Sequence, residues 1–267
     1  MSFVHKKCRV VDVPYLGSQI HRIAVPVELV KWSREWPEYA PPVYTDPQID
    51  GKVWADADID SPHFRPAWNA LDGNVNRVSF VCPYSFDAHL RPINPMGRTG
   101  LAGRGVLGRW GPNHAADPIV TRTSPEDGRL EFVAIQRRDT GEWAIPGGMV
   151  DAGEEVSQTL RREFAEEAMS GVVDTDGLEE LWSNGKTLYR GYVDDPRNTD
   201  NAWMESVVVN FHDTAGLLKN VTLQAGDDAK ALRWIRVDSS EPLYASHQHF
   251  IDLLRESIAS SSSSSDS

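Results

Sequence analysis

The chain has 267 residues, of which 40% are hydrophobic and 25% are charged, and its formal net charge is −12 at pH 7. This length and composition provide the core of one large or two modest globular domains, and they exclude a disordered or fibrous protein. The acidity excludes nucleic acid and anionic membrane surfaces as partners held by bulk electrostatics. An anionic ligand therefore needs a local site or a metal ion.

Cysteine content and hydropathy indicate the compartment. Cys8 and Cys82 allow one disulfide at most, which is typical of a reducing environment. No segment approaches the roughly 20 apolar residues that cross a bilayer, and the N-terminus has neither an apolar signal core nor an Arg- and Ser-rich transit pattern. We therefore expect an intracellular, cytoplasmic protein without direct membrane insertion.

The first part of the chain, residues 1–117, is interrupted by many prolines, so long helices are not expected there. Residues 20–30 and 75–81 are its strand candidates. The remainder is typical of loops that pack on another domain through buried aromatic side chains. The candidate anchors are Trp32, Trp36, Trp54 and Trp68. We expect this part to form a smaller, irregular lobe that contributes to a substrate cleft.

A glycine-rich stretch, residues 97–108, contains the spacing G-x-G-x-x-G. A dinucleotide site needs a strand before this motif and a helix that opens inside it, and prolines flank the motif instead. The favoured interpretation is a loop of tight turns. A second interpretation is that Arg98, Arg104 or Arg109 positions an anionic ligand beside exposed backbone N–H groups.

The second part of the chain alternates strand and helix patterns, which indicates an α/β fold. The expected strands are Ile119–Arg122, Leu130–Arg137, Trp143–Ile145, Leu188–Val193, Glu205–His212 and Leu232–Val237, and the expected helices are 155–169 and Ser246–Ile258. We expect a catalytic domain over residues 118–258. The Ser-rich tail, 259–267, is expected to be disordered.

The helix predicted over 155–169 carries three close carboxylates, because Glu163, Glu166 and Glu167 stand at i, i+3 and i+4. A solvated acidic face is one interpretation. However, a helical wheel places Glu163 and Glu167 in or beside the apolar stripe, whereas Arg162 points to the opposite side. Carboxylates directed at the protein body need a compensating cation. We therefore favour a site for Mg²⁺, or Mn²⁺ in its place, which binds carboxylate and phosphate oxygens.

These residues resemble the Nudix hydrolase family. Gly148, Glu154 and the run Arg162–Glu167 are similar to the Nudix box. The resemblance implies a Nudix α/β/α sandwich with Glu163, Glu166 and Glu167 as metal ligands, Arg162 as a residue that orients a glutamate, and Gly147 and Gly148 as backbone beside metal and phosphate. The chain departs from the family pattern at Ala168, Met169 and Ser170, which concerns the turn after the helix.

Further segments are similar to ADP-ribose pyrophosphatases of the mitochondrial type and to the C-terminal Nudix domain of ADP-ribose-gated melastatin TRP channels. They are Gly97–Gly100, Gly103–Gly105, Arg109–Pro118, Glu142–Gly148, Asp194–Trp203 and Leu243–His247. The resemblance implies ADP-ribose as the ligand. It also implies that Asp195 and Arg197 contact the diphosphate or ribose region, and that Tyr244 and His247 contact the terminal ribose.

The implied reaction is Mg²⁺-dependent hydrolysis of the ADP-ribose diphosphate to AMP and ribose 5-phosphate. Glu166, Glu167 and Glu205 are the alternatives for the general base. One rival hypothesis is an ADP-ribose sensor domain, with the rest of a channel polypeptide as partner and the cytosolic face of a membrane as location. Another is a Nudix enzyme for a different nucleoside diphosphate. A mitochondrial location is also compatible with the resemblance.

Overall fold

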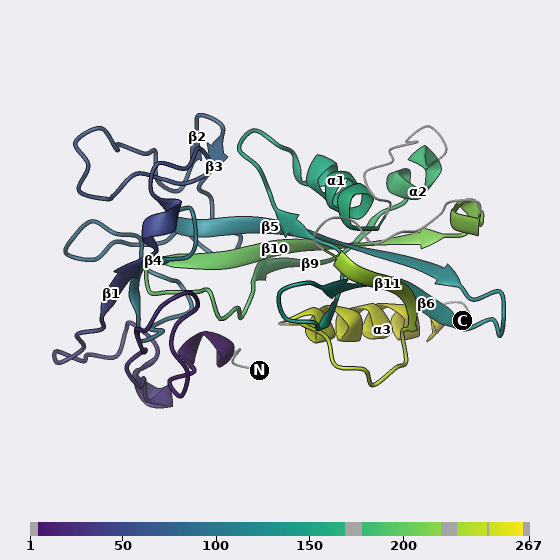
Figure 1. Ribbon diagram of the computed structural model, residues 1–267, viewed down its shortest axis with the longest axis horizontal. Helices are drawn as coiled ribbons and strands as arrows, with labels where there is room; N and C mark the ends of the chain where they lie inside the picture. Colours follow the sequence, from purple (N-terminus) through teal and green to yellow (C-terminus); the bar gives the residue numbers. More distant parts are fainter. Residues whose placement is uncertain (1–4, 169–177, 220–228, 245, 264–267) are drawn as a thin grey trace. The chain divides into compact units, whose positions relative to one another are not determined.

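The computed structural model describes residues 5–168, 178–219, 229–244 and 246–263. They divide into two compact units, which we describe separately (Figure 1). The first comprises Met1–His114, Asp151–Gly153 and Gly191–Glu205, and the second comprises Ala115–Val150, Glu154–Arg190 and Ser206–Ser267. Three strands contribute residues to both units: β5 (Gly111–Thr123), β9 (Lys186–Tyr192) and β10 (Ala202–Asp213).

The first unit is mostly irregular, as its prolines predict. Its short elements are η1 (Lys7–Arg9), η2 (Val27–Leu29), β1 (Val43–Thr45), η3 (Pro47–Ile49), β2 (Leu71–Asp72), β3 (Val75–Asn76) and β4 (Ala102–Gly105). β1 pairs with β4, and β2 pairs with β3. The strand prediction for residues 20–30 was wrong, because Pro26 lacks an N–H and leads into η2 instead. The strand predicted over 75–81 is reduced to β3.

Arginine side chains hold the glycine-rich loop in place. Arg98 donates to three backbone carbonyls and lies 4.7 Å from the centroid of the Trp32 ring, a predicted anchor. The prediction of Trp54 as a buried anchor was wrong, because its side chain is 48% exposed. Arg104 donates to the carbonyl of Gly108, and Arg109 donates to a carboxylate. The guanidinium groups of these three arginines donate to other groups of the protein. The structure therefore does not support the interpretation that they bind an anionic ligand. The dinucleotide alternative was wrong, because no helix stands between β4 and β5.

The second unit contains the sheet predicted for the second part of the chain. Its strand order is β11-β6-β5-β10-β9, with β7 paired to β6 and β8 paired to β5. The strands not yet bounded are β6 (Leu130–Arg137), β7 (Trp143–Ala144), β8 (Gly148–Met149) and β11 (Ala229–Arg236). The helices are α1 (Val156–Ala168), α2 (Glu179–Ser183), η4 (Leu217–Lys219) and α3 (His247–Ser263). All six predicted strands are present: β6 has the predicted bounds, and the ends of the other five are shifted.

Helices cover both faces of this sheet, so the unit is an α/β/α sandwich, the architecture that the resemblance implies. α1 lies on one face and α3 lies on the other (Figure 1). The core between them is formed by large apolar side chains that are almost completely buried: Phe132, Ile135, Phe164, Phe250, Ile251 and Leu254. Among the helices in the described part of the chain, none is long and apolar enough to cross a membrane.

The end of α3 differs from the prediction. The tail, 259–267, was expected to be disordered from its start, but α3 continues to Ser263, and residues 264–267 lie outside the described residues. Extending α3 into the serines costs little free energy, because Phe250 and Leu254 already dock the helix. Each serine costs only about 0.5 kcal/mol of helix propensity. Met169 and Ser170, where the family pattern departs, also lie outside the described residues.

The docking of α3 can be tested at Phe250, which is 1% exposed. We expect Phe250→Ala to lower the free energy of unfolding by about 3–5 kcal/mol, because it leaves a cavity against the sheet. Ile258→Ala is the matched control, since Ile258 is 41% exposed on the same helix, and it should change stability by about 0.5 kcal/mol. Guanidinium unfolding monitored by circular dichroism measures both, and equal losses would contradict this packing.

Candidate active site

The segment Trp143–Gly148 is the backbone of the site. At its start, Ala144 of β7 pairs with Ile135 of β6, and at its end, Gly148 of β8 pairs with Ala116 of β5. Two ladders of the same sheet therefore fix the segment at both ends. Residues 145–147 lie between these ladders and form a turn with Gly148. The resemblance to the Nudix box implies that this turn lies beside metal and phosphate.

The two glycines of this turn each face a carboxylate. A methyl group on Gly147 would overlap Oδ1 of Asp117, and one on Gly148 would overlap the carboxylate of Glu163. The N–H of Gly147 also donates to Oε2 of Glu167, at 2.8 Å. At Gly147 backbone atoms of Ala116 and Asp117 also lie close, so glycine is required there, whereas a side chain on Gly148 would displace the flexible Glu163 carboxylate.

Helix α1 directs two of its three predicted acids at this turn. Glu163 is buried, and burial raises its pKa to about 7, although the Arg162 charge opposes the shift. Burial likewise raises the pKa of Glu167 to about 8; the Gly147 N–H opposes this rise, and the charge of Glu163 adds to it. Both shifts follow from placing carboxylates against the protein body, as the helical wheel predicted. Glu166 is exposed.

Arg162 joins the acids, although the helical wheel directs its Cα–Cβ bond away from them. Its guanidinium contacts Glu154 at 2.9 Å, Glu163 at 2.9 Å and Glu166 at 3.1 Å, and it donates to the carbonyl of Met149. The hydrogen bond to Glu154 raises the pKa of Arg162 further above its ordinary value. A long side chain can thus return to a cluster that its backbone position faces away from.

The chemistry of these residues fits a divalent cation. Within the described residues, no three His, Cys, Asp or Glu side chains are already arranged to hold a metal ion, and Arg162 is the cation that contacts Glu163 and Glu166. However, Glu163 and Glu167 are carboxylates whose burial disfavours their charged forms. A hard cation with oxygen ligands would keep both ionised.

The predicted ribose residues Tyr244 and His247 lie against the same segment. The N–H of Tyr244 donates to the carbonyl of Trp143 at 2.7 Å, and Nδ1 of His247 accepts from the N–H of Ile145 at 2.9 Å. The two rings meet edge to face with centroids 5.8 Å apart. The second unit therefore brings both side chains to the segment whose glycines contact the α1 acids.

Asp117 is a site residue that sequence analysis missed. Its carboxylate accepts a hydrogen bond from Oγ of Ser206, lies against Gly147, and adds to the negative field that raises the pKa values of Glu163 and Glu167. The residue is 6% exposed on β5. The available signal was an acid inside the short apolar run of residues 115–120, since a buried carboxylate needs a partner in its surroundings.

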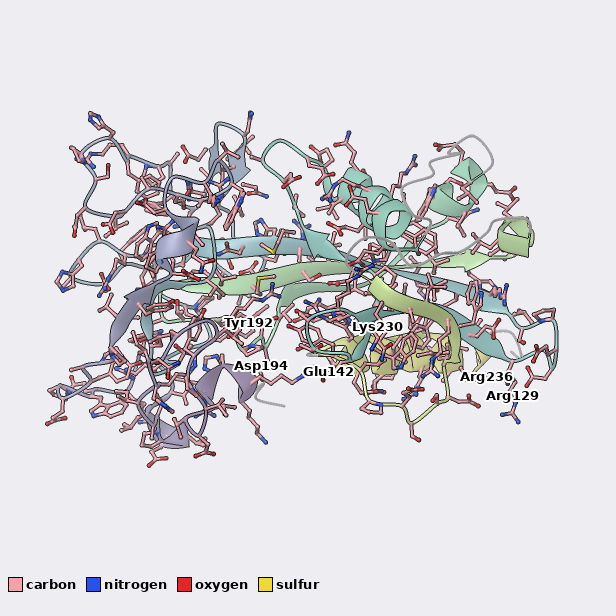
Figure 2. All side chains as sticks on the ribbon, viewed as in Figure 1. Arg129, Glu142, Tyr192, Asp194, Lys230 and Arg236 are labelled. Carbon is pink, nitrogen blue, oxygen red and sulfur yellow. The ribbon has the colours of Figure 1, made fainter. Side chains whose placement is uncertain are left out.

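The predicted residues Asp195 and Arg197 lie in the first unit. Their side chains form a two-pronged ion pair, with Nε to Oδ1 and Nη2 to Oδ2 both at 2.8 Å. The preceding Asp194, labelled with Tyr192 in Figure 2, accepts the N–H groups of Lys6 and Lys7. This segment is held within its own unit.

Glu205 also lies in the first unit, where it is completely buried. Its carboxylate accepts hydrogen bonds from Oγ of Ser79, Nε1 of Trp203 and the N–H of Phe80. Three donors satisfy most of the lone pairs of a carboxylate. This environment is that of a structural acid more than of a group that exchanges protons with substrate.

Comparison with known proteins identifies the family. A family model for the NUDIX domain matches residues 113–254, and one described as the NUDT9-like, N-terminal domain matches residues 25–111. The chain belongs to the Nudix hydrolase family. Membership explains why the turn at Gly147 and Gly148 and the acids of α1 occur together.

Three relatives are similar to most of this Nudix chain. Putative nudix hydrolase 6 of Caenorhabditis elegans is 74% identical, over 96% of this chain and 99% of the relative. The mitochondrial ADP-ribose pyrophosphatase of Rattus norvegicus is 49% identical, over 94% of this chain and 78% of the relative. The transient receptor potential cation channel subfamily M member-like 2 of Nematostella vectensis is 50% identical over 94% of this chain, which spans only 18% of the channel.

The raised pKa of Glu167 predicts how stability depends on pH without metal. Because the folded state holds a proton up to about pH 8 and the unfolded chain releases it near 4.5, stability falls as pH rises through this window. In chelator, Glu167→Gln should therefore melt at the wild-type temperature near pH 4.5 and at a higher temperature at pH 8.5. In excess Mn²⁺ at pH 8.5 the wild type should melt at the higher temperature of the two, because the metal ion should stabilise the wild type alone. A variant less stable than wild type at pH 8.5 in chelator would contradict the buried-acid assignment.

Proposed function

We propose that this Nudix hydrolase cleaves the diphosphate of ADP-ribose to AMP and ribose 5-phosphate, with Mg²⁺ or Mn²⁺ as cofactor. The observation that carries the proposal is the Gly147–Gly148 turn seated against Glu163 and Glu167. The substrate follows from the rat ADP-ribose pyrophosphatase, whose similarity covers 94% of this chain. An intracellular location agrees with this relative, whose name includes the mitochondrion.

In the proposed mechanism, Glu163, Glu166 and Glu167 hold the cation. When bound, a divalent ion neutralises the diphosphate and polarises a phosphoryl oxygen. Arg162 keeps the glutamates in place through its contacts with Glu154, Glu163 and Glu166. The resemblance implies that the backbone at Gly147 and Gly148 lies beside metal and phosphate, and the space left by the missing side chains holds the carboxylates of Asp117 and Glu163.

We assign the general base to Glu167. The reason is geometric, because the N–H of Gly147 fixes one of its oxygens beside the turn. Glu166 is exposed and paired with Arg162, and Glu205 already accepts three hydrogen bonds. Tyr244 and His247 are the proposed contacts of the terminal ribose, and Asp195 with Arg197 those of the diphosphate or ribose region.

A second candidate is an ADP-ribose sensor domain of a TRP-type channel, with the rest of that polypeptide as partner. The observation that favours it is the 50% identity to the Nematostella channel. The two candidates differ in turnover. A sensor requires only binding, whereas the intact glutamates Glu163, Glu166 and Glu167 provide for hydrolysis.

Incubation of the protein with ADP-ribose and Mg²⁺, followed by chromatography for AMP, tests the enzyme. We expect AMP and ribose 5-phosphate in equal amounts, and no product in excess chelator. Glu163→Gln and Glu167→Gln should each lower kcat by at least about 100-fold at an unchanged fold, because each removes a charged oxygen from the metal site. Tight binding without product would overturn the enzyme in favour of the sensor, and full activity of both variants would refute the metal assignment.

A further inference from the structure

The loop of residues 194–198 carries Asp195 and Arg197, the proposed contacts of the diphosphate or ribose region. The Asp195 side chain is 3% exposed, whereas that of Arg197 is 31% exposed. The ion pair between them, and a hydrogen bond from the N–H of Arg197 to Oδ1 of Asp195 at 2.8 Å, orient the guanidinium on the loop. Both contacts lie within the loop, so they do not fix the position of the loop in the first unit.

The hydroxyl group of Tyr15 holds the loop at Arg197. It donates to the carbonyl of Arg197 at 2.7 Å and accepts from the N–H of Val106 at 3.0 Å. Tyr15 is 4% exposed, and a methyl group on Gly105 would overlap its hydroxyl. The hydroxyl therefore ties the carbonyl of Arg197 to the glycine-rich loop, where a glycine leaves the space that it needs.

Arg22 holds the two neighbouring carbonyls. Its Nη2 donates to the carbonyl of Pro196 at 2.8 Å and to that of Asn198 at 2.7 Å. Arg22 is 6% exposed, and its Cζ lies 5.0 Å from the centroid of the Tyr15 ring. A buried guanidinium is costly unless its N–H groups are hydrogen-bonded. Arg22 and Tyr15 thus act on three successive carbonyls of the loop, those of residues 196–198.

The start of the chain also holds the first residue of the loop. The N–H groups of residues 6–8 donate to the Asp194 carboxylate at 2.8, 2.9 and 3.2 Å. The segment 6–22 therefore contacts the loop at Asp194 as well as at residues 196–198. A loop that is fixed in advance costs less entropy when a ligand binds to it.

We propose that Tyr15 and Arg22 are positioning residues for Arg197: they hold the main chain of the loop, so that the Arg197 guanidinium is in place before the ligand binds. The inference rests on the proposed function, in which Arg197 contacts the ligand, and it gives the segment 6–22 a role in ligand binding. A preformed loop contacts the bound substrate and the transition state equally. Its loss therefore raises KM and leaves kcat unchanged.

Steady-state kinetics with ADP-ribose test the two positioning residues. Tyr15→Phe removes one hydroxyl and keeps the ring, so we expect KM to rise about fivefold, the effect of one hydrogen bond, with kcat within about twofold of the wild type. Arg22→Met loses the contacts with two carbonyls and should raise KM at least about tenfold. A wild-type KM in Tyr15→Phe would overturn the proposal even if Arg22→Met does not fold.

Tyr84→Phe is the matched control in the same unit. The Tyr84 hydroxyl also joins two backbone groups, because it donates to the carbonyl of Arg77 at 2.8 Å and accepts from the N–H of Asn69 at 3.1 Å. Tyr84 is 5% exposed, so both variants delete a buried hydroxyl with the same two kinds of partner. Tyr84→Phe should have the wild-type KM. An equal rise in both variants would assign Tyr15 a merely structural role and overturn the proposal.

A double-mutant cycle with Arg197→Gln tests whether Tyr15 acts through Arg197. Arg197→Gln removes the guanidinium that is to be positioned and keeps the carbonyl that accepts from Tyr15. We expect Arg197→Gln to raise KM at least about fivefold, and the further change Tyr15→Phe to have no additional effect. Additive increases in KM would show that Tyr15 acts independently of Arg197 and would overturn the proposal.

Hydrogen exchange tests the loop without any ligand. Peptides that cover residues 194–198 should exchange about fivefold faster in Tyr15→Phe and at the wild-type rate in Tyr84→Phe, and unchanged exchange in Tyr15→Phe would overturn the proposal. If the wild type binds ADP-ribose without turnover, calorimetric affinities replace KM, with the same pattern expected. A wild type that neither cleaves nor binds ADP-ribose would instead overturn the proposed function, and with it the ligand role of Tyr15.

Discussion

The contact between the Gly147–Gly148 turn and three carboxylates is the constraint on which the site depends. Asp117 comes from the sheet, whereas Glu163 and Glu167 come from α1, and the turn lies against all three. A methyl group on Gly147 would overlap the Asp117 carboxylate, and one on Gly148 would displace that of Glu163. The two short ladders of β7 and β8 hold the turn in this position, and Tyr244 and His247 reach the same segment through its backbone.

The burial of two acids beside the turn lowers the stability of the metal-free fold, but the proposed metal site requires these acids. Burial of Glu163 and Glu167 raises their pKa values, so ionising either acid without a cation weakens the fold. Arg162 offsets part of this cost by pairing with Glu163. The proposed ligand is an anionic diphosphate, which an acidic protein needs a further cation to bind, and in the proposal the buried carboxylates are the ligands of that cation. The net charge of −12 thus makes the proposed metal a condition of substrate binding as well as of reaction.

The sequence predicted the parts of the molecule that have strong periodicity or fixed spacing. β6 was predicted residue for residue, and the inward direction of Glu163 and Glu167 followed from 3.6-residue geometry. The return of Arg162 was not predicted, because a helical wheel describes Cβ directions and not the reach of a long side chain. Asp117 was missed because its role arises from contact with Gly147, 30 positions away in the chain, which no local pattern encodes.

Calorimetric titration of Mn²⁺ into Gly148→Ala tests the central claim most directly. The added methyl group would displace the Glu163 carboxylate, so we predict that affinity for Mn²⁺ falls by about 10- to 100-fold, as when groups that orient metal ligands are lost. Gly141→Ala is the control, because no atom lies within 4 Å of an added methyl group there, although alanine is disfavoured at its φ of +73°, and this variant should bind Mn²⁺ as the wild type does. Unchanged Mn²⁺ affinity in Gly148→Ala would contradict the account.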